Sequence, residues 1–272
     1  MNSLNSERLL EDNTKMIPNI IHFIYVLEPN FNDQEFCLVH YLAIKSALEV
    51  NKPDNIYLYY SYEPKNNIWW DKAKELVQLE QIIPPKTIFG NKLYHVAHKA
   101  DVVRLEKLIE RGGIYLDIDT ICVKPFYPLK HHSFVMGYEK DGGRIKGLGN
   151  AVMLSGTKAI FPRVWLGNYL SFRSKGFDNF WVEHSVNLPY KLSQQVPELK
   201  DQIHIEPASS FLSPYYHQED LKKMFVENVE FEDAYCHHLW ETFSYEKYFE
   251  QITVDHIKEV DTTYNLIARR FL

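Results

Sequence analysis

The chain is organised around Arg111-Gly112-Gly113-Ile114-Tyr115-Leu116-Asp117-Ile118-Asp119-Thr120. The two glycines predict the end of a helix, and the apolar residues after them predict a short buried strand. Residues two apart in an extended segment point the same way, so Asp117 and Asp119 can present oxygens to one cation at the end of that strand. Carboxylate oxygens suit Mg²⁺ or Mn²⁺, ions that commonly hold a substrate diphosphate.

The residues ahead of this stretch predict a helix over 94–112 that carries two charged side chains towards it. Asp101 and Arg104 are three residues apart and therefore share one side of this helix. An ordinary salt bridge within the helix would explain the pair. Because the helix leads directly into the two glycines and the aspartates, the pair can also lie beside a metal site.

The remaining segments alternate between strand and helix patterns, and the last part of the chain is rich in Tyr, Phe and His and predicts a helical or irregular region. The predicted strands cover 17–27, 56–60, 114–116 and 150–154, with a further apolar segment at 121–123, and the predicted helices cover 33–50, 68–80, 94–112, 159–174 and 180–196. Residues 1–15 predict a frayed arm or a short helix. This alternation predicts an α/β fold with a mostly parallel sheet, whose ligands gather at the carboxyl ends of the strands.

Three segments between these elements have compositions typical of loops. Residues 139–149 hold four glycines and three basic residues, which predicts a mobile loop that acts as a lid over donor or acceptor. Pro207 to Tyr216 predicts an aromatic loop that can contribute to acceptor binding. His131 and His132 predict a surface loop.

Composition and charge narrow the class of protein. The 272 residues predict one large domain or a domain with an appended lobe, and the net charge of −6 argues against nucleic-acid binding. Three widely spaced cysteines predict neither a disulfide framework nor a zinc site, and they favour a reducing compartment. The apolar run Met16 to Leu27 is too short to span a bilayer, and no signal peptide precedes it. We expect a soluble cytoplasmic protein, with peripheral membrane association compatible.

A D-x-D pattern by itself is compatible with several explanations. The aspartates can cap a helix or face solvent at a strand end. They can also be the nucleophile and general acid of a haloacid-dehalogenase-type phosphatase, although that pattern usually continues with Gly-Thr, whereas Thr120-Ile121 follows here. The third explanation is a metal site of a nucleotide-sugar glycosyltransferase, and the Asp101–Arg104 helix favours it.

The segment Ala97 to Asp119, Ala-His-Lys-Ala-Asp-Val-Val-Arg-Leu-Glu-Lys-Leu-Ile-Glu-Arg-Gly-Gly-Ile-Tyr-Leu-Asp-Ile-Asp, resembles the motif of the D-x-D sugar-transferase family. That family includes initiating α-1,6-mannosyltransferases, α-1,4-galactosyltransferases, capsule and lipopolysaccharide enzymes and, distantly, the catalytic domains of clostridial glucosylating toxins. The resemblance extends over about 17–155, with weaker similarity to about 245. It implies a GT-A fold, which is a Rossmann-like sheet flanked by helices, and a nucleotide-sugar donor with Mn²⁺ or Mg²⁺.

The resemblance also implies roles for four residues of the motif. Asp101 and Arg104 would contact hydroxyl groups of the donor sugar. Asp117 would contact the ribose and the hydrated metal, and Asp119 would bind the metal directly. As a set these four are the expected catalytic residues.

Three further residues match family positions outside the motif. The strand Ile17 to Tyr25 is similar to the family's N-terminal strand, whose aromatic residue stacks on the base; here this is Tyr25, where the family usually has Trp. Asn150 resembles an Asn beside the donor sugar. His238 belongs to a His-x-Trp element from the region that closes the metal site, with the adjacent His237 as the rival candidate.

We therefore expect a metal-dependent glycosyltransferase that moves a sugar from a UDP-sugar, or a GDP-sugar, to a glycan, lipid or protein acceptor. The resemblance implies retention of anomeric configuration. Residues 17–155 would form the nucleotide-sugar half and 156–272 the acceptor half of a single glycosyltransferase domain. The alternatives are a non-catalytic module that binds a nucleotide sugar or a partner, and the phosphatase.

Overall fold

The computed structural model describes residues 16–25, 27–28, 35–231 and 233–272. Its centre is a seven-stranded sheet with the order β10-β8-β9-β6-β1-β2-β3. Every neighbouring pair is parallel except the two that involve β9, which is antiparallel to both β8 and β6. The strands are β1 (Ile20–Tyr25), β2 (Asn55–Tyr60), β3 (Gln78–Gln81), β6 (Gly113–Leu116), β8 (Phe134–Asp141), β9 (Arg144–Ser155) and β10 (His204–Glu206).

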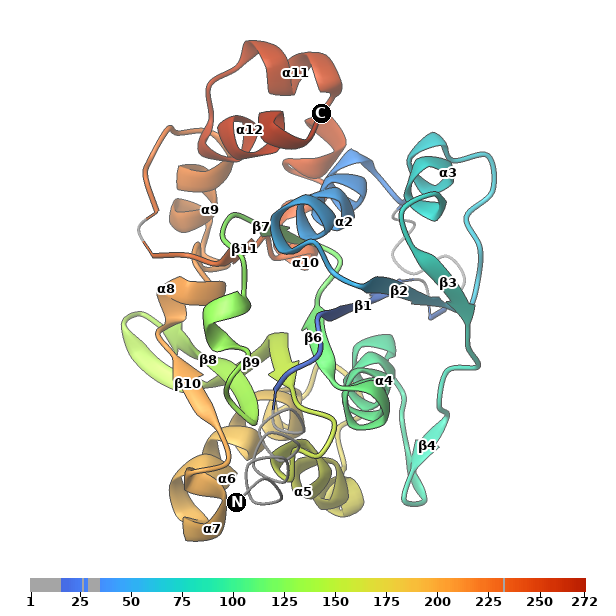
Figure 1. Cartoon of the computed structure of the whole chain (residues 1–272), viewed down its shortest axis with the longest axis vertical. Helices are drawn as coiled ribbons and strands as arrows, with labels where there is room; N and C mark the ends of the chain where they lie inside the picture. The colour runs from blue at the N-terminus through green and yellow to red at the C-terminus, as the bar shows by residue number, and fades with distance from the viewer. Residues whose placement is uncertain (1–15, 26, 29–34, 232) are drawn as a thin grey trace, which may run out of the picture.

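Helices cover both faces of this sheet. Figure 1 shows α2 (Leu38–Asn51) and α4 (Val96–Arg111) on opposite sides of β1 and β6. The core on the α2 side also receives α3 (Ile68–Lys74), and the core on the α4 side receives α5 (Phe161–Gly167) and α6 (Leu188–Gln195). A mostly parallel sheet with helices on both faces confirms the predicted α/β class.

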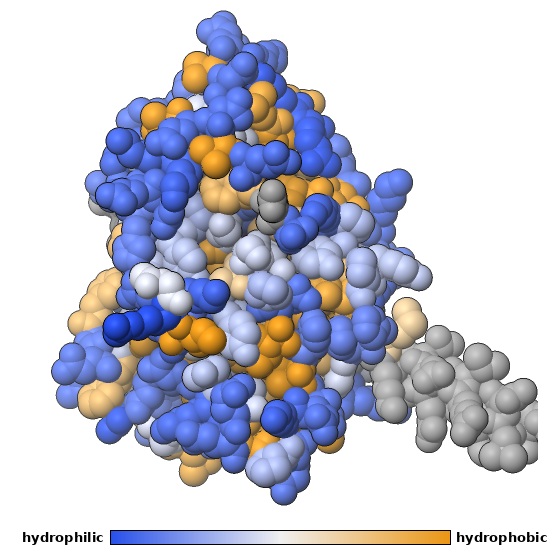
Figure 2. Space-filling model, turned by 90° about the vertical axis from the view of Figure 1, so that its left-hand side faces the viewer, coloured by the Kyte–Doolittle hydropathy of each residue, from blue (hydrophilic) through white to orange (hydrophobic). Residues whose placement is uncertain are grey.

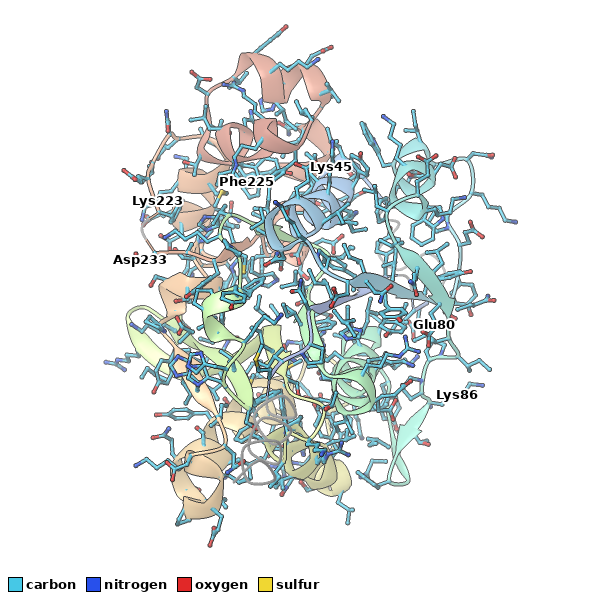
Figure 3. All side chains as sticks on the ribbon, in the orientation of Figure 1. Lys45, Glu80, Lys86, Lys223, Phe225 and Asp233 are labelled. Atoms are coloured by element: carbon cyan, nitrogen blue, oxygen red, sulfur yellow. The ribbon has the colours of Figure 1, made fainter. Side chains whose placement is uncertain are left out.

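A third core lies in the C-terminal part, which is helical as predicted. It joins the first turns of α2 to α9 (Gln218–Phe225), α11 (Val254–Glu259) and α12 (Thr263–Ala268). Phe225, labelled in Figure 3, stacks on Tyr248 with ring centroids 4.7 Å apart and contacts Tyr264 at 5.5 Å. The shorter helices of this half are α7 (Pro197–Lys200), α8 (Ala208–Phe211) and α10 (Glu241–Ser244). On the face drawn in Figure 2, small groups of apolar side chains are separated by polar ones.

Residues 139–149 do not form the predicted mobile loop, and this prediction is wrong. They form the turn of an antiparallel hairpin and the ends of β8 and β9 that adjoin this turn. Gly142 and Gly143 have φ angles of 53° and 82°, and two consecutive positive φ angles are what a two-residue hairpin turn requires. The glycines therefore build a tight turn, and the predicted strand over 150–154 begins earlier, at Arg144.

Other predicted elements differ from the structure at their boundaries. The helix predicted over 68–80 ends at Lys74, and 78–81 instead form β3, an edge strand beside β2. The helix predicted over 159–174 is α5 followed by a 3₁₀ turn, and that over 180–196 is a π-helical turn followed by α6. Residues 1–15, and the first two of the predicted helix 33–50, lie outside the described residues. None of the described helices has the length and apolar character that crossing a bilayer requires.

The two glycines at the centre of the motif are required by close packing. Gly112 ends α4 with φ +64°, and Gly113 has φ +100° at the start of β6. A Cβ atom on Gly113 would lie 2.5 Å from the Ile20 carbonyl oxygen and 3.0 Å from Nε2 of His22. The absence of a side chain at 113 therefore allows β6 to approach β1 and pair with it.

Candidate active site

The two motif aspartates lie in a turn between β6 and β7 (Thr120–Cys122). The Asp117 amide donates to the Ala151 carbonyl at 2.8 Å, and the Thr120 amide donates to the Asp117 carbonyl at 3.0 Å. The backbone therefore leaves the extended path expected for an i, i+2 pair. The turn still brings both carboxylates together, and it does so at the carboxyl end of β6, where ligands gather in α/β folds.

His238 reaches these carboxylates from the far end of the sequence. β11 (Cys236–His238) pairs antiparallel with β7, and the register sets His238 opposite Thr120. Nε2 of His238 lies 3.3 Å from Oδ1 of Asp119 and 3.7 Å from Oδ2 of Asp117. One potential metal-binding atom from each of the three residues lies within 4.8 Å of the other two. Two carboxylates and one imidazole fit a divalent cation that accepts oxygen and nitrogen ligands.

The rival candidate, His237, points away from this cluster. Successive residues of a strand face opposite sides, and Nδ1 of His237 lies 2.7 Å from the Ser213 carbonyl. Burial lowers the pKa of His237 to about 4. It is a neutral core histidine with a satisfied hydrogen bond, so the geometry favours His238 as the ligand.

The ionisable groups of the cluster shift one another's pKa values. Burial alone would lower the pKa of His238, but the adjacent carboxylate of Asp119, followed by that of Asp117, raises it above its usual range. Burial alone would raise the pKa of Asp119, but His238 and the Glu241 amide hold it below its usual range. Burial raises the pKa of Asp117 and outweighs the opposing effect of Arg104.

Arg104 links α4 to the aspartates. Its Nη1 lies 3.1 Å from Oδ1 of Asp117 and donates to the Asn150 carbonyl at 2.9 Å, and its guanidinium lies 4.6 Å from the ring centre of Tyr115. The Tyr115 hydroxyl in turn donates to Oδ1 of Asp117 at 2.6 Å. Arg104 is only 6% exposed, so the surrounding contacts hold its charge in one place.

Asp101 takes part in the same network from behind Arg104. Its Oδ1 accepts a hydrogen bond from Nδ2 of Asn150 at 2.7 Å and lies 3.6 Å from Nη2 of Arg104. Asp101 and Arg104 therefore do not form an isolated salt bridge within α4, because Asn150 of β9 contacts both residues. Asp101 orients Arg104 and Asn150 together.

These groups open onto a cleft with a volume of about 1060 Å³. Tyr25, Arg104, Asp117, Asp119 and His238 all line it, whereas neither Asp101 nor Asn150 is among its described lining residues. Tyr25 lies at the carboxyl end of β1, where its ring meets Phe36 edge-on at 5.0 Å and Trp70 at 5.9 Å. The structure thus brings Tyr25, from the first strand, into the same cleft as the motif.

Sequence patterns did not indicate the contacts made by Trp240 and Glu241. The Glu241 amide donates to Oδ2 of Asp119 at 2.6 Å, and Oε1 of Glu241 lies 2.9 Å from Nε2 of His40. Trp240 packs its ring 4.4 Å from that of His238 and has a φ of 55°, which is uncommon for a bulky residue. Spacing cannot reveal the His40–Glu241 pair, because 201 residues separate its members.

Comparison with known proteins identifies the family of the chain. Residues 32–135 match the family described as the glycosyltransferase sugar-binding region containing the DXD motif. Glucan organizing enzyme 1 of Cryptococcus neoformans var. grubii is 31% identical over 269 residues, which cover 94% of this chain and 71% of that protein. The chain belongs to the DXD-motif glycosyltransferase family. This confirms the resemblance seen in the segment from Ala97 to Asp119.

Three solved glycosyltransferases are similar to the chain at low sequence identity and with TM-scores below 0.5. The PaToxG glycosyltransferase is 19% identical with a TM-score of 0.44, covering 72% of this chain and 77% of that one. GlyE of Streptococcus pneumoniae TIGR4 is 14% identical with a TM-score of 0.49, covering 94% of this chain and 60% of that one. Mouse xyloside xylosyltransferase 1 is 13% identical with a TM-score of 0.43, covering 70% of this chain and 85% of that one. Membership of the family supports a sugar-transfer function for this DXD glycosyltransferase.

Proposed function

We propose that this DXD glycosyltransferase is metal-dependent and transfers a sugar from a nucleotide-diphosphate sugar to a glycan, lipid or protein acceptor. The observation that carries the proposal is the convergence of Asp117, Asp119 and His238 within one cleft that also holds Arg104 and Tyr25. UDP-sugars are the first donors to test and GDP-sugars the second. Retention of configuration is proposed from the family resemblance. The protein's few, unpaired cysteines support a cytoplasmic location.

The cleft supplies what departure of a nucleoside diphosphate requires. Asp119, Asp117 and His238 would hold a divalent cation, Mn²⁺ or Mg²⁺, whose charge would stabilise the departing diphosphate. Arg104 is already fixed by Asp117 and the Asn150 carbonyl, so its remaining N–H groups are oriented without reorganisation at the moment of reaction. Tyr25 supports one side of the base.

The donor sugar would lie in the cleft beside the paired Arg104 and Asp117. As the anomeric bond breaks, the sugar gains oxocarbenium character, which the carboxylate of Asp117 favours electrostatically. Asp101 and Asn150 are in the same hydrogen-bond and ion-pair network as Arg104 and are not among the described residues that line the cleft, so in this geometry they act through Arg104. We propose that they keep the guanidinium in place and become hydroxyl-binding groups when a sugar enters.

Asp119→Asn tests the proposal. Asparagine keeps a carbonyl oxygen that can accept the Glu241 amide, so the variant should remain folded while losing the charge that a metal needs. We expect loss of Mn²⁺-dependent turnover of the nucleotide sugar with little change in the melting temperature. The matched control is Asp233→Asn, whose side chain is 90% exposed and is labelled in Figure 3 at the surface of the molecule. Full turnover by Asp119→Asn would contradict the proposal.

The donor can be identified by thermal shift with UDP-, GDP- and CMP-sugars, each with and without Mn²⁺. A ligand at about 100 times its dissociation constant adds about 2.7 kcal/mol to the free energy of unfolding. A non-catalytic module would show the shift but form no product with any acceptor in a donor and acceptor screen. A phosphatase would instead release phosphate from an aryl phosphate, and family membership speaks against that outcome.

A further inference from the structure

An aromatic cluster forms one border of the cleft. The rings of Phe177 and Trp181 stack with centroids 4.4 Å apart and planes inclined by 28°. His95 meets them edge-on at 4.9 Å and 4.8 Å. All three residues line the cleft, and Phe177 is 75% exposed. An exposed aromatic group bordered by polar residues is typical of a ligand-binding surface, because its exposure to water is otherwise unfavourable.

The segment that carries these rings is held rigidly. The Asp178 carboxylate accepts hydrogen bonds from the Lys175 amide at 2.8 Å and from the Phe180 amide at 2.9 Å. Arg173 forms two hydrogen bonds to Glu183, at 2.6 Å and 2.9 Å, and its guanidinium lies 3.8 Å from the ring centre of Phe180. Phe177 is thus presented on a turn that these hydrogen bonds and this ion pair hold together.

The cluster is also tied to the helix that carries Asp101 and Arg104. His98 of α4 lies 4.6 Å from Trp181, ring to ring, and its Nε2 is 3.2 Å from the Trp181 carbonyl. His95 caps the start of the same helix by accepting from the Ala97 amide at 3.1 Å. From His95 to Arg104 the helix advances nine residues, which is about 13 Å. The cluster and Arg104 therefore belong to different points along the same helix, and both line the cleft.

The base-binding side of the cleft lies elsewhere. Tyr25 packs with Phe36 and Trp70 in the core on the α2 side of the sheet, whereas α4, which carries His95 and His98, packs against the opposite face. A nucleotide that stacks on Tyr25 and reaches the aspartates therefore leaves the Phe177 surface for the other substrate.

We propose that Phe177 and Trp181 form the platform on which a pyranose ring of a carbohydrate acceptor stacks. The apolar C–H face of a pyranose matches an aromatic face, and its hydroxyl groups can reach the polar border of the cleft. The proposal rests on the proposed function, since it places the acceptor opposite a nucleotide-sugar site. It selects a saccharide acceptor from the glycan, lipid and protein alternatives.

The test uses the whole chain, with maltotriose, laminaritriose and α-1,6-mannotriose as probes. Saturation-transfer NMR and tryptophan fluorescence measure the binding of each trisaccharide. We expect at least one trisaccharide to bind and to perturb the fluorescence. Phe177→Ala should weaken that binding about tenfold, in line with the loss of one aromatic contact, and Phe177→Tyr should retain it. The matched control is Tyr127→Ala, because Tyr127 is an aromatic residue of similar exposure, 74%, and is not among the described residues that line the cleft.

Three outcomes would overturn the platform. No trisaccharide binds, or Phe177→Ala binds as tightly as the wild type, or Phe177→Ala weakens nucleotide-sugar binding while leaving the saccharide unaffected. A separate assay, slow hydrolysis of the nucleotide sugar by water, tests the proposed function alone, because hydrolysis needs no saccharide acceptor. If one of these three outcomes is found while Mn²⁺-dependent hydrolysis of the nucleotide sugar is intact, only the platform is rejected. If the protein turns over no nucleotide sugar at all, the proposed function is rejected.

Discussion

The backbone amide of Glu241 donates a hydrogen bond of 2.6 Å to Oδ2 of Asp119, across 122 residues of sequence. The Leu239 amide reaches the Asp119 carbonyl at 2.9 Å, and β11 pairs with β7 beside them. The second motif aspartate is thereby held from two sides by the segment that also carries His238. The candidate metal site is thus assembled by pairing of two short strands, and residues far apart in sequence define its geometry.

His238→Ala should raise the Mn²⁺ concentration needed for half-maximal turnover by at least about tenfold, because it removes a nitrogen ligand 3.3 Å from Asp119. The measurement is a Mn²⁺ titration of nucleotide-sugar hydrolysis. His237→Gln is the matched control in the same strand, since its ring faces Ser213. An equal loss of Mn²⁺ affinity in both variants would show that the strand, and not the imidazole of 238, is responsible.

Arg104→Lys should lower kcat by about 100-fold, because Nη1 alone contacts both Asp117 and the Asn150 carbonyl, and a lysine that reproduced these two contacts would lack the planar Nη2 donor for the substrate. Steady-state kinetics with the identified donor measure this effect. Arg111→Lys makes the same change at the end of the same helix, where the arginine pairs with Glu80, labelled in Figure 3, on β3. That control should retain normal kcat, and a wild-type kcat for Arg104→Lys would exclude the assigned role.

Gly113→Ala should reduce the free energy of unfolding by about 3 kcal/mol, because the new Cβ combines a positive φ with a 2.5 Å approach to the Ile20 carbonyl. Gly142→Ala offers a control with φ +53° and no atom within 4 Å of the new Cβ, so it should cost only about 1 kcal/mol. Urea unfolding of the two variants separates backbone strain from steric overlap. Equal losses of unfolding free energy in the two variants would mean that the overlap with the Ile20 carbonyl of β1 adds nothing to the effect of the positive φ.

The stability of the fold should fall between neutral pH and pH 5 because of His22. Burial lowers its pKa from 6.5 to about 4. The Gly112 carbonyl, 2.7 Å from Nε2, can only accept, so Nε2 carries the proton and Nδ1 accepts from the Tyr59 hydroxyl at 3.0 Å. Between pH 6.5 and about 4 the unfolded chain binds a proton that the folded chain excludes, so the free energy of unfolding decreases as pH falls.

From pH 7 to pH 5 this one group should account for a loss of about 2 kcal/mol. His22→Gln, which keeps a hydrogen-bond donor but cannot titrate, should be less stable at pH 7 and should lose about 2 kcal/mol less over the same interval. Urea unfolding at the two pH values provides the comparison. An unchanged pH dependence in His22→Gln would locate the acid sensitivity in other groups.

Much of the scaffold and part of the site follow from local sequence. β-Branched and aromatic runs predicted β1, β2 and β6, and helical spacing predicted α2 and α4, because those segments bury one face in regular repeats. The hairpin turn at Gly142 was predicted as a lid, because glycine-rich composition suits both mobile loops and tight turns. Only pairing of β8 with β9 distinguishes the two structures.

The sequence by itself determined that Gly112 and Gly113 lead a strand into two carboxylates, and that Asp101 and Arg104 share the preceding helix. Tertiary structure decided which of two adjacent histidines joins them. Neighbouring residues in a strand face opposite sides, so the choice between His237 and His238 depends on the register of β11 against β7. That register is set by contacts between segments more than 100 residues apart, and local patterns carry no information about it. The same holds for Phe177, whose place at the cleft exists only once its turn packs against α4.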